Sequence, residues 1–192
     1  MLKEDLRRSM LLKRRAMPAD EVQRCSVSIA GQFFRHFELQ AGQTVHVFLP
    51  IIKNNEVNTW LIIERLWLEQ PQVRIVVPVT DVEQNLLTHH HLTNEAILVE
   101  NNWGIPEPQD AQIIHAQEVD IVLIPLLAFD RTGHRVGYGK GFYDRFLADC
   151  RPDVLKVGLS LEQPVERISD LNKYDVPLDA VVMPDWVWEA KS

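Results

Sequence analysis

The chain has 192 residues, of which 46% are hydrophobic, and it carries a formal net charge of −7. This length and composition are typical of one globular domain with a sizeable core, so we expect a single domain over residues 1–192. The acidic balance argues against a nucleic-acid-binding protein, whose basic footprint usually shows in the total charge.

The predicted elements begin with two helices. Residues 2–17 contain no Gly, Pro or β-branched residue, a composition that favours a helix. Residues 20–37 repeat apolar side chains at a helical period, so a second helix is expected there. Residues 42–50 have the β-branched composition and the Gly and Pro boundaries of a buried strand, and residues 58–70 return to a helical composition.

Strands dominate the rest of the prediction. Four segments are strand-like in composition: residues 73–79, 86–92, 154–160 and 180–184. A polar, Pro-rich passage covers residues 99–110. The most apolar run, residues 119–130, is predicted to be a central parallel strand, and residues 141–150 are predicted to form a short helix.

This alternation of strands and helices predicts an α/β fold. We expect a single-domain, three-layer α/β/α arrangement with a mostly parallel, open, Rossmann-like sheet. In such sheets ligands bind beyond the carboxyl ends of the strands. The segment RTGHRVGYGKGFYDR, residues 131–145, directly follows the most apolar run, so its position predicts a binding site.

The composition of this segment favours an anionic ligand. Gly137, Gly139 and Gly141 alternate with Tyr138 and Lys140. Glycines let a backbone approach a ligand closely, and successive N–H groups can then converge on an anion. Lys140 adds a mobile cation. A flexible Gly-rich turn before a helix is the alternative that composition alone leaves open.

Arg135 and Asp144 flank these glycines. The Arg135 guanidinium suits phosphate oxygens, and the N-terminus of the following helix would face the same anion. Asp144 would repel a phosphate unless a divalent cation lay between them, and Mg²⁺ commonly bridges carboxylates to phosphates. The spacing fits neither a P-loop nor a dinucleotide-binding fingerprint, because Gly141 follows Lys140 and Phe142 replaces the last glycine.

Two further patterns have alternative interpretations. On a helix, Lys3, Arg7 and Arg14 fall on one stripe, which would close over a polyphosphate or form a solvated face. On a strand, His89 and His91 share a face and could ligate a metal. No carboxylate or Cys pattern accompanies the histidines, so a solvated or substrate-edge role is expected for them.

The compartment is predicted from the cysteines and from hydropathy. Cys25 and Cys150 are far apart and fit no CxxC pattern, so free thiols in a reducing compartment are expected. The chain has no run of about eighteen apolar residues, and its N-terminus mixes acidic with basic side chains, unlike a secretory signal. We therefore predict a cytoplasmic protein that binds neither nucleic acid nor membrane.

Several segments resemble the 5-formyltetrahydrofolate cyclo-ligase family, also called methenyltetrahydrofolate synthetases. AFDRTGHRVGYGKGFYDR is similar to the family signature, in which Phe-Asp, a Gly and an Arg precede G-x-G-x-G-[FY]-[YF]-D. Further likeness follows in family order along the chain: LKEDLRRSMLLKRRAM, FLPIIKNNEVNTWLII, WGIPEP and DVPLDAVVMP.

The resemblance implies an enzyme that uses ATP and Mg²⁺ to convert 5-formyltetrahydrofolate, with or without a polyglutamate tail, into 5,10-methenyltetrahydrofolate, ADP and phosphate. Phosphoryl transfer to the formyl oxygen would make that oxygen a good leaving group, and N10 would then attack the activated carbon. Such chemistry asks the protein mainly for positioning and charge neutralisation. We expect a monomer. The alternative is a non-catalytic folate- or nucleotide-binding protein on the same scaffold.

The resemblance also implies site residues. The residues that would bind ATP are Lys3, Arg7, Arg135, Gly137, Tyr138, Gly139, Lys140, Gly141, Phe142 and Tyr143. Two of these, Arg135 and Lys140, would also act in catalysis. Folate would be bound by Glu56, Asn58 and Trp103. Magnesium would be bound by Asp144 and Asp175, with Asp179 as the reserve for the second position. Two departures from the family pattern support the non-catalytic alternative, since Tyr138 stands where Arg or Met is common and Asn58 where an acid is expected.

Overall fold

The computed structural model describes residues 1–81, 84, 86–101 and 104–191. Trp103, a predicted folate contact, lies outside the described residues. None of the described helices is long and apolar enough to cross a membrane.

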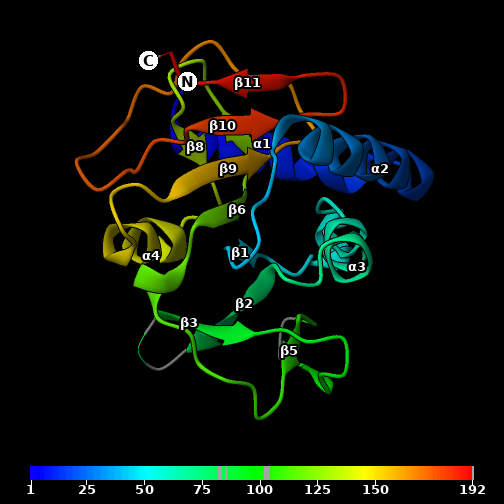
Figure 1. The fold of residues 1–192 in the computed structure, drawn as a ribbon. Helices are drawn as coiled ribbons and strands as arrows, with labels where there is room; N and C mark the ends of the chain where they lie inside the picture. Colours follow the sequence, from blue (N-terminus) through cyan, green and yellow to red (C-terminus); the bar gives the residue numbers. More distant parts are fainter. Residues whose placement is uncertain (82–83, 85, 102–103, 192) are drawn as a thin grey trace.

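A seven-stranded sheet forms the centre of the described structure, with the strand order β11-β10-β9-β6-β1-β2-β3 (Figure 1). In chain order its strands are β1 (Thr44–Val47), β2 (Arg74–Asp81), β3 (Leu86–His91), β6 (Ile121–Pro125), β9 (Leu155–Leu159), β10 (Ala180–Val182) and β11 (Val187–Glu189). The inner pairs, from β2 through β1, β6 and β9 to β10, are parallel, whereas β3 and β11 add antiparallel edges. The predicted open, mostly parallel sheet is confirmed, and β6 is its central strand.

Helices cover both faces of this sheet (Figure 1). The elements outside the sheet include α1 (Lys3–Ala16), α2 (Ala19–His36), α3 (Trp60–Glu69), α4 (Phe142–Asp149) and the short 3-10 helices η1 (Ile52–Asn54) and η2 (Ala116–Glu118). Alternate side chains of β6 enter different cores, because successive residues of a strand point to opposite faces. Leu123 packs in the core beneath α2 and α3, and Val122 packs in the core beneath α4. The three-layer α/β/α prediction is therefore confirmed.

The predicted strand over residues 119–130 is too long. The sheet strand ends at Pro125, and β7 (Ala128–Phe129) instead pairs with β8 (Arg135–Val136) in a small antiparallel ladder. The backbone between β6 and β7 forms a hydrogen bond outside the central sheet, since the Leu127 amide donates to the Val136 carbonyl at 2.7 Å. The Pro-rich passage also contains structure that we did not predict, because β4 (Leu98–Glu100) and β5 (Pro106–Pro108) form a second ladder.

The expectation of a solvated or substrate-edge role is wrong for His89. Its side chain is buried between β1 and α4, where its Nδ1 lies 3.2 Å from the Nε2 of His46 and its ring stacks on Phe146 at 3.9 Å. Burial lowers the pKa of His89 to about 4 and holds that of His46 well below its usual value.

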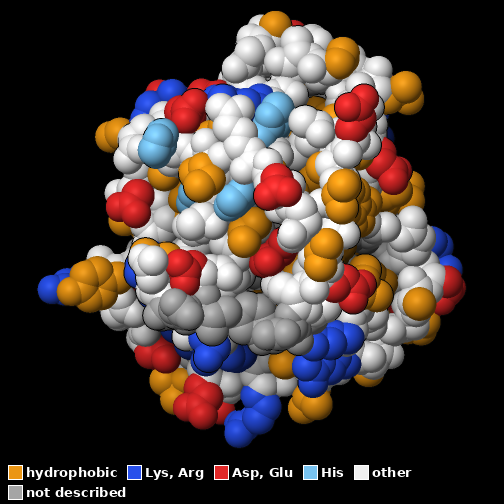
Figure 2. All heavy atoms as spheres, turned by 90° about the horizontal axis from the view of Figure 1, so that it is seen from below, with side chains coloured by type: hydrophobic (Ala, Val, Ile, Leu, Met, Phe, Trp, Pro, Cys, Tyr) orange, Lys and Arg blue, Asp and Glu red, His pale blue; other side chains and the backbone are white. Residues whose placement is uncertain are grey.

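The outer face of the sheet's β3 edge is mixed in character, with acidic, hydrophobic and histidine side chains interspersed (Figure 2).

Candidate functional site

The Gly-rich segment lies beyond the carboxyl end of β6, as predicted. Gly139 and Gly141 have φ values of +86° and +68°. A residue with a Cβ adopts such a backbone conformation only with steric strain. Gly141 immediately precedes α4 and ends the loop. Gly139 and Gly141 are therefore favoured by the turn itself, which brings the loop backbone to the N-terminus of a helix.

Helix α1 lies against this loop. The Arg7 Nε donates a hydrogen bond to the Gly137 carbonyl at 2.9 Å, and a Cβ on Gly139 would lie 3.0 Å from the Arg7 Cζ. Lys3, one turn earlier on the same face, forms an ion pair with Asp175. The stripe of cations on α1 thus faces the body of the protein, and its interpretation as a solvated face is wrong.

Arg14 completes the stripe at the other end of α1. Its side chain is buried, and its Nη2 donates to the Leu126 carbonyl just after β6. Arg14 therefore binds the backbone where the sheet strand ends, and it holds α1 across the carboxyl edge of the sheet.

The two predicted magnesium ligands both lie near Arg135, and each has a basic partner. Arg135, whose side chain is 7% exposed, donates from Nη2 to the Asp144 Oδ1 at 2.7 Å and from Nη1 to the Val176 carbonyl. The Val176 amide donates to the same Asp144 oxygen at 3.2 Å, which places Asp175 beside Asp144. Burial acts to raise the pKa of Asp175, but hydrogen bonds from Lys3 and the Asn172 amide outweigh it and leave that pKa lowered.

Glu56, a predicted folate contact, meets the Gly-rich loop through Tyr138. The Tyr138 hydroxyl donates to the Glu56 Oε1 at 2.5 Å, and the Ile51 amide donates to the other carboxylate oxygen at 2.7 Å. Glu56 is 5% exposed, and burial raises its pKa. The structure therefore joins a residue predicted for the nucleotide to one predicted for folate.

The remaining loop residues differ in exposure. The Lys140 side chain is exposed, and its carbonyl accepts a hydrogen bond from the Arg145 Nη2 at 3.0 Å. The Phe142 ring lies 5.5 Å from the Arg145 Cζ. The Tyr143 hydroxyl is buried without a hydrogen-bond partner among the described residues, and burial raises its pKa. Lys140 is thus the exposed cation of the loop.

Two predicted residues are not brought to this cluster. The Asn58 side chain donates to the Gln23 Oε1 at 3.2 Å and accepts a hydrogen bond from the Trp60 amide at 3.2 Å. It therefore binds the first backbone N–H group of α3. Asp179, the reserve choice for magnesium, pairs with Lys156 at 2.7 Å near the amino ends of β9 and β10. Within the described residues no group of three or more His, Cys, Asp and Glu side chains is placed to hold a metal ion.

Two contributors escaped the sequence prediction. The backbone of Val176 binds both Arg135 and Asp144, and a backbone contact leaves no signal in residue type. Asn54 is buried, accepts hydrogen bonds from Arg15 at 2.8 and 3.2 Å, and lies 3.5 Å from the Tyr138 hydroxyl. Its position in a polar run, IKNN, gave no reason to single it out.

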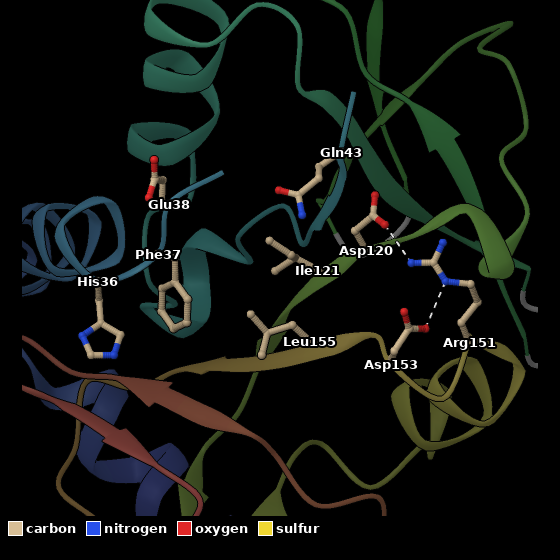
Figure 3. A pocket seen from close by; sticks show the side chains of 9 residues that line it. All are labelled: His36, Phe37, Glu38, Gln43, Asp120, Ile121, Arg151, Asp153 and Leu155. Carbon is tan, nitrogen blue, oxygen red and sulfur yellow. Dashed lines mark hydrogen bonds and ion pairs between the residues drawn. The ribbon is translucent and has the colours of Figure 1, made fainter. Parts of the chain in front are cut away.

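Two hollows lie at opposite edges of the sheet. A small one at the carboxyl ends of the strands is lined by Arg14, Phe48, Glu56, Val57, Pro125, Leu126 and Leu159. A larger pocket of about 320 Å³ opens at the amino ends, and Figure 3 shows the nine side chains that line it. There Arg151 pairs with Asp120 at 2.7 Å and with Asp153 at 3.2 Å, so its charge is already neutralised.

The fold and the carboxyl-edge cluster define an open α/β-sheet protein whose polar site is assembled from a Gly-rich loop and an N-terminal basic helix. Comparison with known proteins makes the class specific. The sequence model of the 5-formyltetrahydrofolate cyclo-ligase family matches residues 1–184, and the chain belongs to that family. The predicted family is confirmed, and with it the prediction of an enzyme family.

Relatives match over nearly the whole chain. The 5-formyltetrahydrofolate cyclo-ligase of Escherichia coli strain K12 is 34% identical over 182 residues, which cover 92% of this chain and 97% of the relative. The mouse protein of the same name is 25% identical over 194 residues, covering 95% of this chain and 94% of the relative.

Solved structures agree with this assignment. The 5,10-methenyltetrahydrofolate synthetase of Aquifex aeolicus superposes with a TM-score of 0.84 at 28% identity, covering 100% of this chain and 94% of that one. The synthetase of Mycoplasma pneumoniae superposes with a TM-score of 0.76 at 24% identity, covering 96% of this chain and 100% of that one, and it supports the fold alone.

Proposed function

We propose that the chain, as a single domain over residues 1–192, converts 5-formyltetrahydrofolate into 5,10-methenyltetrahydrofolate with consumption of ATP in the presence of Mg²⁺. Family membership supports the overall reaction. The observation that carries the nucleotide part is the contact of Arg7 with the Gly137 carbonyl, because it joins the cations of α1 to the Gly-rich loop at the carboxyl edge.

In this proposal the loop and its cations hold the triphosphate. The amides of residues 137–141 would supply N–H donors, and the N-terminus of α4 would add a favourable field. Lys140 is exposed and therefore free to follow the transferred phosphoryl group, whereas Arg7 is fixed against the loop. Lys3 and Arg135 add positive charge on the side of the two carboxylates. Phosphoryl transfer asks for such positioning and charge neutralisation rather than for a nucleophilic side chain.

Asp144 and Asp175 would hold the magnesium ion. Their carboxylate oxygens are the ligands that Mg²⁺ prefers, and the amide of Val176, the residue after Asp175, donates to Asp144. Asp144 uses the same Oδ1 for both of its hydrogen bonds, to Arg135 and to the Val176 amide. When bound, Mg²⁺ would neutralise phosphate charge. Lys3 pairs with Asp175 and Arg135 with Asp144, so a basic side chain holds each carboxylate.

Folate would bind on the Glu56 side of the cluster. Glu56 lines the small hollow at the carboxyl edge, and a buried carboxylate there can accept hydrogen bonds from the N–H groups of a flat heterocycle. Asn58 and Trp103 stay predicted folate contacts. We also propose a cytoplasmic monomer, which size-exclusion chromatography would test.

The test follows the absorbance of the methenyl product. The protein is incubated with 5-formyltetrahydrofolate and supplied with ATP and Mg²⁺ together, with each alone, or with neither. Product that requires both, with ADP and phosphate formed in equal amounts, supports the proposal. Binding of folate or nucleotide without turnover would favour the non-catalytic alternative, which the departures from the family pattern at Tyr138 and Asn58 support.

A further inference from the structure

Tyr138 does not contribute its hydroxyl to the anion-facing side of the Gly-rich loop. The hydroxyl instead points to the Glu56 carboxylate, 82 positions away in sequence, at 2.5 Å. This length is typical of an O–H group that donates to an ionised carboxylate, which is a strong hydrogen bond. A loop predicted to bind phosphates thus holds a residue on the folate side of the site.

The contact is buried and supported from both ends. Glu56 also accepts from the Ile51 amide at 2.7 Å, so each of its carboxylate oxygens has a donor. On the other side Asn54 lies 3.5 Å from the Tyr138 hydroxyl and is itself held by Arg15. Such a chain of buried contacts fixes the orientation of the carboxylate.

Three neighbours set the charge state of Glu56 among the described residues. Burial raises the pKa of Glu56, whereas the hydrogen bonds from Ile51 and Tyr138 and the charge of Arg14 act to lower it. Glu56 in turn acts with burial to raise the pKa of Tyr138 and of Tyr143. Removal of the Tyr138 hydroxyl would therefore raise the pKa of Glu56 further.

We infer that Tyr138 is a positioning residue that holds the Glu56 carboxylate for the folate substrate, and that it is not a ligand of the nucleotide. This inference rests on the proposed function, because it assigns a role within that reaction. Arg or Met is common at this position in the family. In this chain Tyr138 instead connects the nucleotide loop to the folate side of the site by a hydrogen bond.

The test compares Tyr138→Phe with Tyr174→Phe. Both substitutions delete one hydroxyl, and Tyr174 is 71% exposed. For Tyr138→Phe we expect the KM for 5-formyltetrahydrofolate to rise roughly tenfold, the size of a lost hydrogen bond to a charged group. The KM for ATP and kcat should change by less than about twofold. A general destabilisation of the fold would not change the KM for folate while leaving the other two parameters unchanged. Tyr174→Phe should match the wild type.

Two further readouts separate positioning from a structural effect. The acid limb of kcat/KM for folate should move to higher pH in Tyr138→Phe, because the Glu56 carboxylate loses a hydrogen bond that favours its ionised form. Glu56→Gln keeps the shape of the side chain, and Tyr138→Phe should cost nothing further in that background. A melting curve confirms that each variant is folded.

The possible outcomes separate the two proposals. A Tyr138→Phe enzyme with unchanged folate kinetics, or with only the KM for ATP raised, would overturn the inference and leave the proposed function standing. Effects of Tyr138→Phe and Glu56→Gln that simply add would also overturn it. Failure of the wild type to turn over folate with ATP and Mg²⁺ would overturn the proposed function, and this inference with it.

Discussion

The two edges of the central sheet differ in the charge that they gather. The carboxyl edge gathers five cations, Lys3, Arg7, Arg14, Arg135 and Lys140, against three acids, Glu56, Asp144 and Asp175. The pocket at the amino edge is larger, but the three acids that line it, Glu38, Asp120 and Asp153, outnumber Arg151 (Figure 3). A triphosphate would suit the first edge and would be repelled by the second. The sign of the local charge therefore identifies the site better than the size of the hollow.

The largest contrast between the edges is expected for a pair of matched aspartate substitutions. Asp144→Asn keeps an oxygen that can accept from Arg135 but weakens the proposed magnesium site, so kcat should fall roughly 100-fold or more. Asp153→Asn removes an exposed acid that pairs with Arg151 at the amino edge, and turnover should stay within about twofold. Steady-state kinetics at several Mg²⁺ concentrations measure both. Equal losses in the two variants would contradict the assignment of the edges.

A second prediction concerns the stability of the fold at acid pH, to which the buried histidines contribute. The buried pair His46 and His89 has lowered pKa values in the folded protein, so the unfolded chain binds protons first, below about pH 6.5. Stability is therefore complete above that pH and falls as the pH drops toward 4, by about 1.4 kcal/mol per pH unit for each histidine that stays neutral when folded.

Urea unfolding at pH 7, 6 and 5 measures this slope. His89→Gln should flatten it, because it removes one of the two buried imidazoles with a lowered pKa. A slope that is the same in the wild type and in His89→Gln would exclude the buried pair as its cause.

A smaller effect is expected within the Gly-rich loop itself. Gly139→Ala forces a Cβ onto a residue with φ +86°, 3.0 Å from the Arg7 guanidinium carbon, and should cost about 1–2 kcal/mol of stability. Gly137→Ala meets nothing within 4 Å and should be tolerated. Thermal unfolding compares the two variants, and the opposite ranking would show that the loop does not have this conformation.

The position of the Gly-rich loop at the carboxyl end of β6 could be predicted from sequence because its signals are local. The apolar run that forms β6 and the glycines that follow it lie within one short stretch, and the strand-end rule predicts a ligand there. The point at which β6 ends could not be predicted, since Leu126 to Phe129 stay buried after the strand has finished. Hydrophobicity reports burial and does not show where the chain leaves a sheet.

The partners within the site could not be predicted because they are distant in sequence. Lys3 and Asp175 are 172 positions apart, and Tyr138 and Glu56 are 82 apart. The residue types at these positions indicated a polyanion and a metal, but not which side chains hold one another. The same limit applies to His89, whose partner His46 lies 43 positions away on β1.

The most direct measurement is calorimetric titration of a non-hydrolysable ATP analogue with Mg²⁺ into the wild type, Lys140→Ala and Arg151→Ala, with and without folate. We expect one equivalent to bind to the wild type, affinity to fall roughly tenfold in Lys140→Ala, and no change in Arg151→Ala, whose cation lies at the amino edge. No binding by the folded wild type under either condition, or a loss confined to Arg151→Ala, would contradict the placement of the nucleotide at the carboxyl edge.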